Sequence, residues 1–129
     1  MNSLVGKFKA LEREIAEEKG DFILFALFMR DNSLPDHWDL VVCAPWIEEM
    51  GPQALAYFVS KIKPKLKKSE FMKLSQVAMV DPSDPRVRAI NREFHVEHGA
   101  AEIHNRTFFD MDMDHGFIIT SKRAVKRAA

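Results

Sequence analysis

The chain has one cysteine, five glycines and no net charge, and these small numbers exclude several classes of protein. A single cysteine excludes an internal disulfide and a zinc cluster built from several thiolates. We find no glycine-rich phosphate loop, no nucleophile beside a base and no zinc motif. No apolar run approaches the roughly 20 residues of a membrane-spanning helix, so we expect no membrane association. Residues 1–7 lack the apolar core of a signal peptide, which predicts a cytoplasmic location.

The zero net charge hides a segregation of charge along the chain. Residues 1–50 hold ten acidic and five basic side chains, a net charge of −5, whereas residues 51–75 hold six lysines and Glu70, a net charge of +5. Residues 76–115 carry −4 and residues 116–129 carry +4. Opposed patches on a neutral molecule favour self-association. We therefore expect a homodimer, with a different protein partner as the alternative.

The longest apolar run, Phe22–Met29, predicts the architecture. It does not alternate between apolar and polar residues, and turn residues flank it on both sides. Such a run is typical of a strand that is buried on both faces. At 129 residues the chain is long enough for one domain with a substantial core. We expect this strand at the centre of the sheet, with helices above and below it.

The remaining pattern predicts a single α+β domain in the order αββαβαββ, with three helices and a mixed sheet of about five strands. Leu4, Phe8, Leu11 and Ile15 form the apolar stripe of a first helix over 3–19, which either packs on the sheet or forms a dimer seam. An antiparallel hairpin, a crossover helix and a parallel strand follow. The expected ranges are strands 22–30, 38–44, 75–80, 101–109 and 116–121, helices 52–63 and 85–95, and a frayed tail over 122–129.

The strand that starts near residue 101 holds the first candidate site. Strand alternation places Glu102, His104 and Arg106 on one face. An acid, an imidazole and a guanidinium in a row can bind an anion or perform acid–base chemistry, which makes these three the candidate catalytic residues. The alternative is a solvated outer face with ordinary ion pairs.

Histidines and aspartates around this strand form a candidate cation site. Asp110, Asp112 and Asp114 alternate in a predicted loop that ends at His115, and they can hold a divalent cation, although glycine and glutamate are missing from the positions that an EF-hand requires. His95 and His98 lie three residues apart at the predicted helix end, as two metal ligands would. An acidic loop and histidines that complement a helix dipole are the plainer interpretations.

No other segment favours a specific chemistry. Cys43 lies in an apolar strand, which indicates a buried structural thiol. The lysines between residues 61 and 73 lack exposed aromatics and arginines, so nucleic-acid binding is not expected, although it stays an alternative. The leading hypothesis is a non-catalytic binding or assembly module. The competing one is a small metal-dependent hydrolase that uses residues 95–115.

Overall fold

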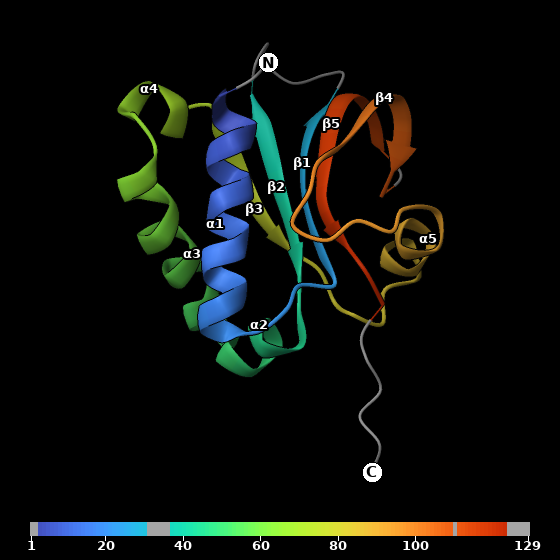
Figure 1. The fold of residues 1–129 in the computed structure, drawn as a ribbon, viewed down its shortest axis with the longest axis horizontal. Helices are drawn as coiled ribbons and strands as arrows, with labels where there is room; N and C mark the ends of the chain where they lie inside the picture. Colours follow the sequence, from blue (N-terminus) through green and yellow to red (C-terminus); the bar gives the residue numbers. More distant parts are fainter. Residues whose placement is uncertain (1–2, 31–36, 110, 124–129) are drawn as a thin grey trace.

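The computed structural model describes residues 3–30, 37–109 and 111–123 and shows helices on both faces of one sheet (Figure 1). The order of elements follows the predicted αββαβαββ pattern, with extra short helices in the crossover. The helices are α1 (Ser3–Lys19), α2 (Pro45–Met50), α3 (Ala54–Ile62), α4 (Lys68–Phe71) and α5 (Pro85–Glu93), with 3₁₀ turns η1 (Gly51–Gln53) and η2 (Lys63–Lys65). The strands are β1 (Leu24–Arg30), β2 (Trp38–Cys43), β3 (Leu74–Met79), β4 (Ala101–Phe108) and β5 (Met111–Ser121).

The sheet has the order β3-β2-β1-β5-β4, which places β1 in the centre as the apolar run predicted. β1 pairs antiparallel with both β2 and β5, and β2 pairs in parallel with β3 across the helical crossover. The predicted α+β class and five-stranded mixed sheet are therefore confirmed. α1 and α3 cover one face of the sheet, and α5 covers the other (Figure 1).

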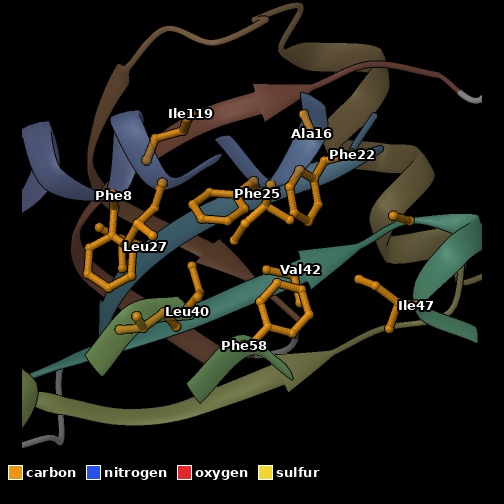
Figure 2. Packing of buried hydrophobic residues seen from close by; sticks show 14 of the residues in the cluster. Phe8, Ala16, Phe22, Phe25, Leu27, Leu40, Val42, Ile47, Phe58 and Ile119 are labelled. Carbon is orange, nitrogen blue, oxygen red and sulfur yellow. The ribbon is translucent and has the colours of Figure 1, made fainter. Parts of the chain in front are cut away.

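β1 contributes alternate side chains to two separate cores. Phe25 and Leu27 face α1 and α3, where they pack with residues such as Phe8 and Phe58 (Figure 2). Leu24, Ala26 and Phe28 face the opposite side, where α5 supplies Val87 and Ile90. Each fully buried side chain of this size stabilises the fold by about 1.5–3 kcal/mol before the entropy cost is subtracted.

The apolar stripe of α1 belongs to the core of the monomer. Leu4, Phe8, Leu11 and Ile15 are between 0 and 6% exposed and lie in the cluster that covers one face of the sheet. The stripe therefore packs on the sheet, and the alternative of a dimer seam along it is wrong.

The segment between β2 and β3 departs from the single predicted helix. Pro45 starts α2, and a second helix begins only after Gly51, whose φ of 61° is one that glycine adopts without strain. Pro52 and Pro64 lie in the 3₁₀ turns on either side of α3. The helix predicted over 52–63 is thus present as η1 and α3, whereas α2 and α4 are additional short helices that the sequence analysis did not predict. Of the predicted tail, 124–129 lie outside the described residues.

Over the part of the chain that the structure describes, no helix combines the length and the apolarity that crossing a membrane requires.

Two glycines provide a matched test of the packing. A methyl group on Gly116 would lie 2.9 Å from Phe28 Cδ1 and 3.0 Å from both Ile103 Cγ1 and the carbonyl oxygen of Leu27, whereas one on Gly6 meets nothing within 4 Å. We expect Gly116→Ala to lower the free energy of unfolding by about 1–3 kcal/mol through overpacking. Gly6→Ala, at an exposed position in the first turn of α1, should raise it by up to about 0.5–1 kcal/mol. Urea unfolding measures both, and equal midpoints would contradict the packing around β5.

Candidate functional site

The hairpin of β4 and β5 brings Glu102, His104 and His115 together on its outer surface. His104 and His115 are direct partners in the strand register, and their rings stack with centroids 4.5 Å apart. Nε2 of His115 lies 2.6 Å from Oε2 of Glu102, and Nε2 of His104 lies 3.2 Å from the same oxygen. One potential ligand atom from each side chain lies within 4.8 Å of the other two. We call these three residues the hairpin cluster.

The hairpin cluster is open to solvent on one side and supported by aromatic rings on the other. Ile103 is only 5% exposed, so Glu102 and His104 point outward from the buried face of β4. The ring of His115 lies 4.8 Å from the ring of Phe117 and 5.7 Å from that of Trp38, measured between centroids. The hydrogen bond from His115, assisted by the charges of both histidines, lowers the pKa of Glu102. The carboxylate is thereby held in its anionic form.

Arg106 does not join the hairpin cluster, and the expectation that strand alternation places it beside His104 is wrong. Asn105 adopts a left-handed φ of 50°, which interrupts the alternation of β4. The guanidinium of Arg106 instead lies over the rings of Phe94 and Phe108, and it binds Glu93 of α5. Arg106 therefore lies toward the α5 side of the sheet.

The aspartates lie apart from the hairpin cluster because the predicted loop is largely strand. β5 begins at Met111, and alternation of methionine and aspartate is itself the pattern of a strand with one buried face. Asp112 accepts a hydrogen bond of 2.7 Å from Thr107, and Asp114 is exposed. Asp110 lies outside the described residues. Of the described residues in this segment, only His115 therefore belongs to the hairpin cluster.

His95 and His98 are not paired on a helix, because α5 ends at Glu93 rather than near His95. Nε2 of His95 lies 3.1 Å from the carbonyl oxygen of Arg92. His98 has a left-handed φ of 51°, and its side chain points toward α1. Its Nδ1 lies 2.5 Å from a carboxylate oxygen of Glu12. The predicted shared metal site of His95 and His98 is therefore not formed.

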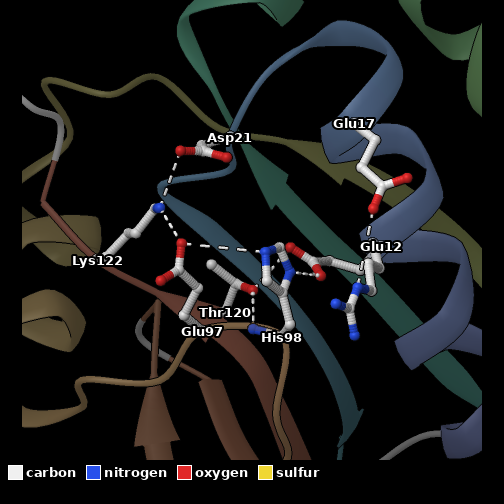
Figure 3. Close-up of polar contacts among 8 residues, drawn as sticks. Glu12, Glu17, Asp21, Glu97, His98, Thr120 and Lys122 are labelled. Carbon is white, nitrogen blue, oxygen red and sulfur yellow. Dashed lines mark hydrogen bonds and ion pairs between the residues drawn. The ribbon is translucent and has the colours of Figure 1, made fainter.

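Glu12, His98 and Thr120 form a second polar cluster, which sequence reasoning missed (Figure 3). Glu12 is fully buried on α1, and the hydroxyl of Thr120 donates to its second carboxylate oxygen over 2.8 Å. The backbone N–H of His98 donates to the same hydroxyl over 3.1 Å. Nδ1 of His98 and the hydroxyl of Thr120 thus contact different oxygens of the Glu12 side chain. Both oxygens of the buried carboxylate are thus satisfied.

An irregularity in the sheet places Thr120 next to Glu12. Ala26 of β1 pairs with Ile118 of β5, but the preceding residue, Phe25, pairs with Thr120. Ile119 is therefore an extra residue on β5. This bulge turns Thr120 from the α5 face to the α1 face. The only signal in the sequence was the spacing of Glu12 four residues after Phe8, which places both on one side of a helix.

Lys122 continues this network toward solvent. Its ammonium group binds Asp21 and Glu97, and Glu97 lies 4.0 Å from Nε2 of His98 (Figure 3). Partial burial acts to lower the pKa of Lys122, but the two carboxylates outweigh it, so the net pKa is raised. Lys122 therefore stays protonated and links β5 to the segments on either side of it.

Cys43 is a buried thiol, and two of the lysines between residues 61 and 73 pair with acids of α1. Burial raises the pKa of the Cys43 thiol to about 12, which leaves it without nucleophilic thiolate. Lys61 binds Glu18 at 2.5 Å, and Lys65 lies 3.7 Å from Glu14. Acids of α1 thus neutralise part of the basic segment within the same molecule, which weakens the case for a nucleic-acid surface.

The buried cluster predicts a large effect of neutralising Glu12. Glu12→Gln removes the charge that His98 and Thr120 surround, and we expect it to lower the free energy of unfolding by about 1.5–3 kcal/mol. Glu17→Gln, on the exposed side of the same helix, is the control and should change it by less than about 0.5 kcal/mol. Urea unfolding at pH 7 measures both. Equal stability of the two variants would show that the Glu12 carboxylate is not held as described.

Comparisons with known proteins find no relative of this chain. Neither a family model, nor a curated protein, nor a solved structure matches this chain.

Proposed function

We propose that this protein is a non-catalytic binding module that takes up a divalent transition-metal ion of the zinc class through Glu102, His104 and His115. The observation that carries this proposal is the convergence of two imidazoles and one carboxylate, with ligand atoms within 4.8 Å of one another. Imidazole and carboxylate are ligands that Zn²⁺ binds in proteins, and two histidines with one glutamate are a known three-ligand set for it.

The distances suit a tetrahedral ion after small side-chain movements. Zinc bonds of about 2.0–2.1 Å at tetrahedral angles place ligand atoms roughly 3.4 Å apart. The His104–Glu102 separation of 3.2 Å is close to this value, and the His115–Glu102 separation of 2.6 Å needs a modest increase. The ion would replace the hydrogen bond that now joins His115 to Glu102. Both histidines lie on paired strands, so the backbone need not be reorganised.

Exposure supports binding rather than hydrolysis. The side chains of Glu102, His104 and His115 are 50, 61 and 27% exposed, so the cluster lies on an open surface. A catalytic zinc ion acts inside a dry, shaped cavity. The metal-dependent hydrolase stays a prediction that this exposure does not favour, and the cytoplasmic location stays a prediction as well.

An open surface also suits assembly. Three protein ligands leave one tetrahedral position, which a side chain of a second molecule can fill. The proposed homodimer would then be joined through the metal, and the stripe of α1 would take no part in it. A different protein partner could use the same open position.

Zinc titration tests the proposed site. We expect tag-free protein to bind one Zn²⁺ per chain in isothermal titration calorimetry, and His115→Ala and His104→Ala to weaken binding by at least about 10–100-fold because each removes a ligand. His95→Ala and Asp112→Asn are matched controls, since these side chains lie outside the hairpin cluster, and they should bind as wild type does. Absence of binding in wild type, or equal losses in the controls, would refute the site.

Light scattering tests the assembly separately. At micromolar protein with one equivalent of Zn²⁺ we expect the mass of a dimer, and in EDTA the mass of a monomer. His104→Ala should be monomeric in both conditions. A monomer in the presence of bound zinc would refute the metal-linked dimer and leave the binding site standing.

A further inference from the structure

The α5 face of the molecule contains a cavity of about 470 Å³ that the hairpin cluster does not use. Arg88, Asn91 and Arg92 of α5 line it, together with Ile23 before β1, Pro82 before α5 and Arg123 after β5. Its volume lies within the range of small-molecule sites. The cavity is formed where three segments meet that are far apart in the sequence.

The arginines of this cavity differ from the other arginines of the molecule. Seven arginines occur within the described ranges, and four of them lie beside a carboxylate: Arg13 beside Glu17, Arg30 beside Asp39, Arg86 beside Asp84 and Arg106 beside Glu93. The three for which this part of the chain offers no carboxylate partner are Arg88, Arg92 and Arg123, and all three line the cavity. Three positive charges are thus gathered around one hollow without a counterion among the described residues.

The spacing of two of these arginines points to an anion. Arg88 and Arg92 are four residues apart on α5, so their charges repel each other on one helical face. A guanidinium donates two parallel hydrogen bonds to a carboxylate or a phosphate. An anion held between these arginines would remove the repulsion and supply the missing counterion.

The rest of the lining indicates that the ligand is organic. Ile23 and Pro82 add apolar surface. The side-chain nitrogen of Asn91 donates to the carbonyl oxygen of Ile23 over 3.1 Å and to Oγ of Ser121 over 2.9 Å. Both amide hydrogens are therefore used, so Asn91 offers a ligand only its oxygen as an acceptor.

We propose that this cavity binds a small organic anion, a phosphate ester or carboxylate with an apolar body, through Arg88, Arg92 and Arg123. The apolar body would lie against Ile23 and Pro82. This site is independent of the hairpin cluster, which lies on the other side of the sheet.

Four probe compounds test the proposal by calorimetry at low ionic strength: phenyl phosphate, benzoate, inorganic phosphate and phenol. We expect phenyl phosphate or benzoate to bind more tightly than both inorganic phosphate and phenol, because only these two carry an anion and an apolar body. The order of phenyl phosphate and benzoate distinguishes a phosphate ester from a carboxylate as the preferred class. No binding of either at millimolar concentration, or equal affinity for inorganic phosphate, would overturn the proposal.

Charge-neutralising variants locate the site. Arg88→Gln and Arg92→Gln should each weaken binding of the tighter probe by about 10- to 100-fold, the loss expected for hydrogen bonds to a charged group. Arg13→Gln, on the exposed surface of α1, changes the net charge equally and should bind as wild type does. In NMR spectra the probe should shift the side-chain amide signals of Asn91. Equal affinities of Arg92→Gln and Arg13→Gln, or unmoved Asn91 signals in a bound sample, would overturn the proposal.

Discussion

Burial of β1 on both faces is the constraint on which the rest of the structure depends. Its side chains need a helical layer on each side, and the two layers are unequal: α1 with α3 on one face, and the nine-residue α5 on the other. Phe108 of β4 completes the smaller layer by stacking on Phe28, with ring centroids 5.4 Å apart. This requires the end of the β4–β5 hairpin to turn toward α5. The same turn, at Asn105, separates Arg106 from the histidines that stay on the outer surface.

Many charged side chains of this molecule form ion pairs with residues of the same chain. The acidic first helix and the basic segment after residue 60 lie next to each other, and their pairs Lys61–Glu18 and Lys7–Glu70 join segments that are 43 and 63 residues apart. Charge segregation along a sequence therefore does not imply opposed patches on the surface. Among the arginines of the described ranges, those without such a partner are Arg88, Arg92 and Arg123, and all three line the α5 cavity.

The polar network of Glu12, His98 and Thr120 shows how α1 is aligned on the sheet. A buried carboxylate is costly unless its oxygens are bonded, and here one bond comes from Thr120 of β5 and the other from His98 before β4. The arrangement needs a bulge at Ile119 and a left-handed His98, two local irregularities that act together. Such a network favours one alignment of α1 on the sheet over others that would leave the carboxylate unpaired.

The sequence by itself determined the elements and their order. The apolar run of β1 and the stripe of α1 each act within a few residues of chain, so periodicity predicted them. It also indicated Glu102 and His104 on one face of a strand, and His115 as a separate candidate in a cation site. Only the tertiary structure showed that these three converge, that Arg106 departs, and that Glu12 is buried. The reason is that pairing register and bulges depend on contacts between distant residues, such as the 108 positions that separate Glu12 from Thr120.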